Sequence, residues 1–416
     1  MRLLAALCLS TALAAPAFAA TPEEVTQHYA DMALATYQDS LTTAQALQQA
    51  VAALVANPSD ETLSAAREAW KAARVPYQQS EAFRFGNPIV DDWEGRVNSW
   101  PLDEGLIDYT SADYGNEENA LATLNVIATP KFTLSGKEID ATTITPELIS
   151  GTLHEADGIE ANVASGYHAI EFMLWGQDLN GTNPGAGARP YTDYAAGDAC
   201  TNGNCDRRAA YLQSATDLLV SDLTEMVDNW DEDGAARAAV LADPQKGILA
   251  ALTGMGSLSY GELGGERMKL GLMLNDPEEE HDCFSDNTHN SHYYDGLGIQ
   301  NVYLGQYTRV DGSVLQGPAL ADLVAAADPA VDTQLKAELD ASVTALKAVK
   351  DAGDAGKTYD TLIAPGNAEG EALIMGAVNA LVTQTASIDR AVTALGLSKV
   401  EFEGSQSLDN PNAVFQ

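Results

Sequence analysis

Residues 166–178 are GYHAIEFMLWGQD, and the rest of the chain is organised around this stretch. His168 and Glu171 are three residues apart in an apolar run, so on a helix both side chains lie on one face, one turn apart. An imidazole and a carboxylate held in this way can share one divalent or ferric ion. A hydrogen-bonded pair without a metal is the simpler alternative.

The four residues after Glu171 are apolar, which indicates that its carboxylate enters a core. An unpaired charge in such a place is costly. A bound cation is one way to offset that cost.

The first 19 residues have the features of a secretory signal peptide. Arg2 supplies the positive start, residues 3–15 are apolar, and Ala17-Phe18-Ala19 is a cleavage site of the small-x-small type. No later apolar run is long enough for a transmembrane helix. We therefore expect a periplasmic protein, secreted through residues 1–19, with no transmembrane segment.

The chain is strongly acidic. It has 22 basic and 60 acidic residues and a formal net charge of −38, which argues against nucleic acid or an anionic membrane as a partner. Hydrophobic residues make up 45% of the chain, enough to form real cores. Solubility is the simplest explanation for most of the acids, and a surface that attracts cations follows in either case.

Apolar residues at three- and four-residue spacing predict helices through much of the chain. The expected helical segments are residues 22–85 with a break at 57–60, 208–230, 237–275, 318–350 and 368–395. Residues 86–118 are expected to be a loop, and no strand pattern of any length is found. The sequence predicts an all-α fold of two helical bundles packed side by side, residues 20–177 and 209–416, joined by residues 178–208.

An internal duplication is a weaker expectation. Tyr77, Glu81 and Arg84 fall on one helix face. Glu262 and Glu266 repeat part of this pattern in the second half, and an acidic segment follows both copies. If the echo is real, carboxylates from both bundles face the contact between them.

Residues 278–296 hold the densest cluster of potential ligands and include three of the six histidines. We expect at least one of Asp282, Asp286 and His289 to have a functional role. An acidic surface loop is the alternative.

Cys200 and Cys205 flank the turn residues Asn202 and Gly203. In an exported protein this spacing predicts a local disulfide. A metal-binding pair is the alternative, although no second cysteine pair completes a zinc site. Cys283 is left over, either inert or close to a metal site.

Several catalytic motifs are absent from the sequence. It has no G-x-S-x-G motif, no glycine-rich phosphate loop and no H-E-x-x-H zinc helix. His168 and Glu171 supply at most two ligands, and a mixed histidine and carboxylate set in a helical bundle suits iron.

Several motifs, in order along the chain, resemble those of the imelysin family. They are Trp70–Gly86, Val97–Asp103, Gly166–Gly176, Arg189–Tyr194 and Glu280–His289. The last two resemble the iron-regulated branch. The family consists of periplasmic or surface proteins named after an insulin-cleaving peptidase, and it resembles the periplasmic component of a ferrous-iron uptake system.

The resemblance implies an iron site made of His168, Glu171, Glu81 and Asp103. Arg84 and Tyr77 lie on the helix of Glu81, where Arg84 is placed to orient a carboxylate. Further candidate ligands come from the second half of the chain: Glu262, Glu266, Asp282 and His289.

The expected function is iron binding in the periplasm, for iron acquisition or sensing, with an iron-transport or redox protein of the membrane as partner. A metallopeptidase with zinc or another divalent metal is the first alternative. Haem binding is the second, although the sequence has no C-x-x-C-H motif.

Overall fold

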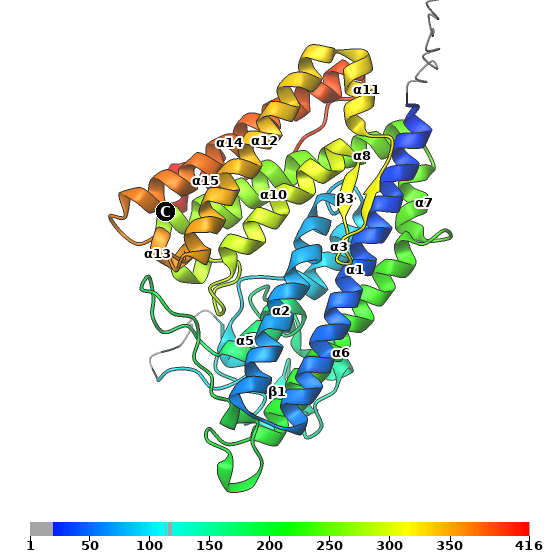
Figure 1. Cartoon of the computed structure of the whole chain (residues 1–416). Coiled ribbons are helices and arrows are strands. Elements are labelled where there is room, and N and C mark those ends of the chain that lie inside the picture. The colour runs from blue at the N-terminus through cyan, green and yellow to red at the C-terminus, as the bar shows by residue number, and fades with distance from the viewer. Residues whose placement is uncertain (1–19, 113, 115–118, 416) are drawn as a thin grey trace, which may run out of the picture.

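The computed structural model of the protein describes residues 20–112, 114 and 119–415. Helices dominate this part of the chain, which confirms the predicted all-α fold (Figure 1). The expected signal peptide, residues 1–19, lies outside the described residues. Among the residues described, no helix combines the length and the apolar character needed to cross a bilayer.

The first group of helices is built on α1 (Pro22–Ala56). It packs against α2 (Asp60–Ser80) and α6 (Cys205–Trp230). Capping boxes explain where the first two helices begin: Thr21 caps α1 and Ser59 caps α2, each with a reciprocal bond from the third helical residue. The break between α1 and α2 lies where the sequence predicts it.

The second group contains α8 (Pro244–Ser257), its π-helical continuation η7 (Leu258–Leu270), α10 (Thr288–Leu304), α12 (Pro329–Asp354) and α14 (Ala368–Ala394). Helix α12 packs on α10 and α14, and α14 packs on η7. Helix α10 also packs on α2, and we call this contact between the two groups the seam (Figure 1).

Backbones meet directly near the seam at two glycines. A Cβ on Gly298 would lie 2.5 Å from the carbonyl oxygen of Gln79, and one on Gly254 would lie 2.3 Å from that of Ala82. Both distances are far inside van der Waals contact. Only glycine permits this approach, so these two positions set how closely the groups of helices pack.

The packing crosses the predicted connection at residues 178–208. Helix α6 follows most of that connection in sequence, yet it packs against α1 and against α5 (Gly166–Trp175). Helix α7 (Ala235–Leu241) likewise contacts α1. The first group of helices therefore contains segments from both sides of the connection. The division into two domains and the internal duplication stay predictions.

Two segments differ from the expected loops. Helix α3 (Pro88–Asn98) lies inside residues 86–118, where the Asn87 side chain caps it and Pro88 is its first residue. In residues 278–296, Asp282 and His292 are buried, so this segment is not a surface loop. Its second half forms the start of α10, whose mixed buried face has no apolar periodicity that would reveal a helix.

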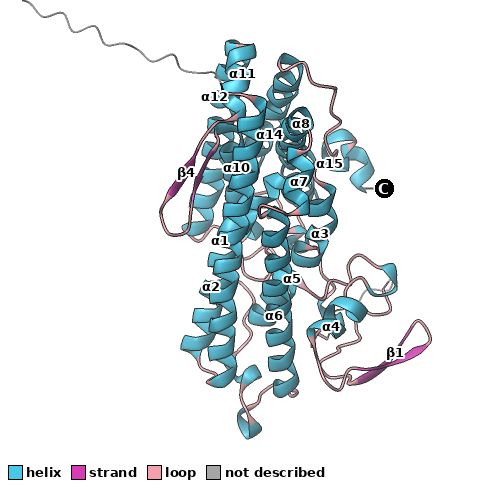
Figure 2. Ribbon diagram, turned by 90° about the vertical axis from the view of Figure 1, so that its right-hand side faces the viewer, coloured by secondary structure: helices cyan, strands magenta, loops and turns pink. Residues whose placement is uncertain are grey.

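The sequence also did not predict two short antiparallel hairpins (Figure 2). They pair β1 (Lys131–Leu134) with β2 (Lys137–Asp140), and β3 (Gln306–Thr308) with β4 (Val314–Gln316). Strands of three or four residues are too short to show alternation.

The remaining helical elements are short: η1 (Glu81–Phe83), η2 (Glu104–Leu106), α4 (Pro146–Leu148), η3 (Ile149–Leu153), η4 (Ala156–Gly158), η5 (Tyr191–Tyr194), η6 (Gly197–Ala199), α9 (Gly271–Leu274), η8 (Pro277–Glu279), α11 (Leu320–Ala327), α13 (Tyr359–Leu362), α15 (Gln406–Asp409) and η9 (Pro411–Phe415).

Helix α5 is buried along its whole length. It begins at Gly166, where φ is +82° and a Cβ would lie 2.3 Å from the carbonyl oxygen of Val97. The hydroxyl of Ser165 donates to the carbonyl of Arg96 at 2.8 Å. The glycine therefore lets the end of α3 close over the start of α5, which fixes the position of His168 two residues later.

Gly166→Ala is expected to lower the free energy of unfolding by about 2–4 kcal/mol, because the new methyl group strains the backbone and collides with Val97. Gly356→Ala is the matched control, since Gly356 also has a positive φ of +88° but open space around it. It should cost about 1 kcal/mol. Urea unfolding of both variants measures the difference, and equal losses would contradict the role given to Gly166.

The predicted disulfide between Cys200 and Cys205 is confirmed. A buried ion-pair cluster holds the same region: Asp108 accepts from Arg208 Nε at 2.6 Å and from Arg189 Nη1 at 2.6 Å. The start of α6 thus has two independent attachments to the fold.

The double variant Cys200→Ser, Cys205→Ser should lower the free energy of unfolding by about 2 kcal/mol, as expected for a short closed loop. Limited proteolysis should become faster within residues 195–205, while the circular dichroism spectrum stays helical. Loss of the folded state at 25 °C would show that the disulfide, and not the Asp108 cluster, holds this region.

Candidate metal centre

His168 and Glu171 lie on one face of α5, as their spacing predicts. Both are buried, with 1% and 0% of their surface exposed, and His168 Nδ1 lies 3.0 Å from Glu171 Oε2. Glu171 Oε1 accepts a hydrogen bond from the backbone N–H of Ser285 at 2.9 Å. The motif therefore meets a loop from the second half of the chain.

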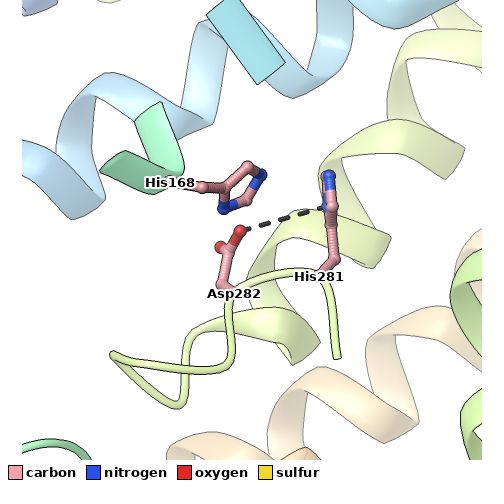
Figure 3. Close-up of side chains that lie close together, drawn as sticks. All are labelled: His168, His281 and Asp282. Carbon is pink, nitrogen blue, oxygen red and sulfur yellow. Dashed lines mark ion pairs between the residues drawn. The ribbon is translucent and has the colours of Figure 1, made fainter. Parts of the chain in front are cut away.

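That loop brings two further candidate ligands to His168. The ligand atoms of His168, His281 and Asp282 all lie within 4.8 Å of one another, and all three residues are buried. Figure 3 shows His281 and Asp282 extending from neighbouring positions of the loop toward the ring of His168. The two imidazole rings are 4.8 Å apart between centroids.

Asp282 is held by donors from both halves of the chain. Its Oδ1 accepts from Arg74 Nη2 at 2.8 Å, and its Oδ2 accepts from Asn287 Nδ2 at 2.8 Å and from the Ser291 hydroxyl. Arg74 also donates to Asn98 Oδ1 at 2.6 Å. These bonds fix the carboxylate in one orientation, as outer partners of metal ligands do.

The imidazoles are set up as neutral nitrogen donors. Burial and the charge of Arg74 hold the pKa of His168 well below its usual value, and burial together with Arg267 does the same for His281. His168 Nε2 is buried and has no hydrogen-bond partner among the described residues. A metal ligand needs such a free, unprotonated nitrogen.

The two carboxyl groups behave differently. Burial raises the pKa of Glu171 well above its usual range, and the neighbouring Asp282 adds to this. Burial also opposes the ionisation of Asp282, but Arg74 and His168 bring its pKa below the usual value. The arginine thus favours the charged form of Asp282, whereas burial disfavours a charge on Glu171 unless a cation offsets it.

A cavity of about 240 Å³ lies beside this group. His281 and Trp100 line it together with Glu94, Glu262 and Arg267. The cavity therefore places His281 next to a second cluster of charges near the seam.

Glu81 belongs to that second cluster rather than to the His168 group. It is buried and pairs with Arg267 at 2.8 Å, while Arg84 lies farther away at 3.9 Å. Arg267 also binds Glu262 at 2.8 Å and Asp295 at 3.1 Å. Arg267, not the predicted Arg84, is thus the closer partner of the Glu81 carboxylate.

Tyr77 packs against Tyr167 with 4.8 Å between ring centroids. Its ring centre also lies 5.7 Å from the guanidinium of Arg74, which binds Asp282. Its place is consistent with a wall of the site rather than with a ligand.

The structure does not bring the other predicted ligands into the His168 group. Asp103 accepts from Tyr114 at 3.1 Å and from Asn119, so it ties loops together. His289 faces Asp354 at 3.4 Å, and Glu266 is half-buried on η7.

His281 is the residue that the predicted ligand set left out. It lies in the histidine-rich segment, but a loop has no periodicity that tells which of its side chains point inward. Asp282, its neighbour, was among the predicted ligands.

Comparison with known proteins identifies the family. The sequence profile of the imelysin family matches residues 33–388. The chain is a member of the imelysin family. The resemblance predicted from the motifs is confirmed.

Two relatives carry the same name. Iron-regulated protein A of Synechococcus elongatus is 38% identical over 61 residues, which is 14% of this chain and only 17% of that protein. A crystal structure from Parabacteroides distasonis ATCC 8503, assigned as an iron-regulated protein A precursor, superposes with a TM-score of 0.64. It covers 91% of this chain and 97% of that chain at 20% identity, so the likeness shows a shared fold.

Two substitutions separate the roles of the carboxyl groups. Asp282→Ala leaves Arg74 buried and unpaired, so it should lower the free energy of unfolding of the metal-free protein by about 3–5 kcal/mol. Burial favours the neutral form of Glu171, so Glu171→Gln, an uncharged amide of the same shape, should cost less than about 1 kcal/mol. Urea titrations in the presence of a chelator measure both. A loss for Glu171→Gln as large as that for Asp282→Ala would mean that Glu171 is ionised in the metal-free protein.

Proposed function

We propose that this imelysin-family protein binds iron in the periplasm and serves iron acquisition or sensing. The observation that carries the proposal is the buried group of His168, His281 and Asp282, whose ligand atoms lie within 4.8 Å of one another. Two histidines and one carboxylate are the ligand set that non-haem ferrous proteins use.

Each residue would contribute a different property to the bound ion. His168 and His281 supply neutral nitrogens, and Asp282 supplies a negative charge that Arg74 keeps in place. Glu171, 3.0 Å from His168, supplies a second carboxylate. The two carboxylates together can balance the two positive charges of a ferrous ion in a site of low dielectric.

The route to the site favours small cations. The cavity beside His281 is lined by Glu94, Glu155 and Glu262, and the chain as a whole has a net charge of −38. The glutamates outnumber Arg84 and Arg267 in this lining, and a predominantly acidic wall raises the local concentration of cations.

A zinc metallopeptidase is the alternative that the same ligands allow. Two histidines and a carboxylate can hold catalytic zinc, with Glu171 in reach of a bound water. The cavity of about 240 Å³ is smaller than the roughly 300–1,000 Å³ typical of sites for drug-sized ligands. That size disfavours both an extended peptide and haem, and iron is therefore the better supported ligand.

Location and partners are part of the proposal. The disulfide between Cys200 and Cys205 suits an oxidising compartment, and the expected signal peptide directs the chain there. The relatives named iron-regulated protein A support a role in iron handling. An iron-transport or redox protein of the membrane would receive the metal.

The test is a titration of the untagged, chelator-treated protein with Fe²⁺ under nitrogen. His168→Ala and His281→Ala should each weaken binding by more than the roughly 10- to 100-fold expected from loss of an outer partner, because each removes a ligand. His28→Ala is the matched control, since His28 is also buried but bonds to the carbonyl oxygen of Gly305 at 2.9 Å. Asp351→Ala controls for loss of a surface acid.

Glu81→Ala decides between the two ligand sets. Full binding by Glu81→Ala with loss in His281→Ala supports the set described here. The reverse result restores the predicted set with Glu81, and equal affinity in all variants ends the proposal. Chelator-sensitive peptide cleavage that is abolished in Glu171→Gln, with metal still bound, would favour the peptidase.

A further inference from the structure

A second group of acidic side chains gathers beside the candidate metal centre. Asp178 follows α5, Asp286 lies in the loop before α10, and Asp360 lies in α13. One carboxylate oxygen from each lies within 4.8 Å of those from the other two. Glu280, from the same loop as Asp286, is close enough to interact electrostatically with Asp360 and Asp286.

Most of these carboxylates are buried without a protein donor. Asp360 and Glu280 are each 1% exposed and Asp286 is 9% exposed. Both oxygens of Asp360, both of Glu280 and one of Asp286 have no hydrogen-bond partner among the described residues. Buried polar atoms without partners are rare in folded proteins, and a bound ion is one of the few explanations.

Other buried carboxylates of this protein are neutralised by arginine. Asp108 binds Arg208 at 2.6 Å, and Asp282 binds Arg74 at 2.8 Å. No ion pair to an arginine or lysine is found for Asp178, Asp286, Asp360 or Glu280 among the described residues. This acidic group is built differently from the ion-pair clusters nearby.

The electrostatics agree with this difference. Burial, followed by the charges of Asp360 and Asp178, raises the pKa of Asp286 to about 7. Lys71 acts on Asp286 too weakly to reverse the shift. Without a cation, these groups repel one another.

The ligand chemistry selects a hard cation. Carboxylate oxygens converging from several segments are the ligands that Ca²⁺ prefers, with water completing its six to eight positions. Asp178 is half-buried and leaves the group open to solvent. Its Oδ1 accepts from the backbone N–H of Asn180 at 2.8 Å and from the Asn180 side chain at 2.7 Å, which orients the carboxylate.

We propose that Asp178, Asp286 and Asp360, together with Glu280, bind a divalent cation of the calcium type, and that this cation fixes the loop that carries His281 and Asp282. Cation binding at this second site does not require iron, and the proposal goes beyond the proposed function.

The connection between the sites is the loop itself. Glu280 precedes His281 directly, and Asp286 adopts a positive φ of 55° just before α10 begins. The carbonyl of Phe284 accepts from the N–H of Gly187 at 2.9 Å, in the segment that follows Asp178. A cation held by Glu280 and Asp286 therefore restrains the loop at both sides of the His281 and Asp282 pair.

The first experiment is a calcium titration of the full mature chain after chelator treatment, by calorimetry and by thermal unfolding. The wild type should bind one Ca²⁺ with a Kd of about 10⁻⁴–10⁻³ M or tighter, the range of extracellular calcium modules. Asp360→Asn and Glu280→Gln should weaken binding at least about tenfold. Asp351→Asn, an exposed acid paired with Lys347, is the matched control and should bind as the wild type does.

The variants also report on folding. Asp360→Asn removes one of the repelling charges, so the metal-free variant should melt at the same temperature as the metal-free wild type or above it. Hydrogen exchange of residues 280–287 should slow when Ca²⁺ binds the wild type and stay unchanged in Asp360→Asn.

His168→Ala distinguishes this proposal from the previous one. It should keep wild-type calcium affinity, whatever happens to iron binding. Equal calcium affinity in the wild type, Asp360→Asn and Glu280→Gln would mean binding to surface acids only and would overturn the proposal. Absence of any calcium effect on the wild type would also overturn it and would mean that protons neutralise the group.

Discussion

The ion pair between Arg74 and Asp282 holds the two groups of helices together at the candidate metal centre. Its atoms Nη2 and Oδ1 are 2.8 Å apart, and both side chains are almost fully buried. Arg74 comes from α2, whereas Asp282 precedes α10, so the pair joins segments about half a chain apart. The guanidinium also lies 5.0 Å from the ring centre of Tyr167. Removing either charge would leave the other one stranded in the interior.

The buried acidic residues fall into two classes, those whose carboxylate pairs with an arginine and those whose carboxylate does not. Glu81 and Asp108 have arginine partners and are committed to holding segments in place. Asp282 has an arginine partner and also faces two neutral imidazoles, so it can both hold segments in place and bind a metal ion. Within the described part of the chain Asp286 and Asp360 have no such partner, and this is why we propose them as cation ligands. Arginine pairing is thus more informative here than the number of acids in a segment.

The sequence predicted the parts of the fold that depend on local signals. Capped helices such as α1 and α2, the break between them, and the disulfide all follow from neighbouring residues. The pairing of His168 with Glu171 follows from helical spacing. His281 could not be chosen over its neighbours, because the partners that select it, such as Gln78 at 3.2 Å, come from another helix. For the same reason, nothing near Glu81 in the sequence indicates that Arg267 binds it.

The backbone contacts at Gly298 and Gly254 bear on which ions the centre can select. Because the main chains already touch at these glycines, the two groups of helices cannot move closer around a smaller ion without a clash between backbone atoms. The separation between His168 on α5 and the loop of His281 is therefore preset by the scaffold. A preset separation between the ligands would favour ions of one radius over other ions of equal charge. The scaffold itself would then contribute to metal selectivity.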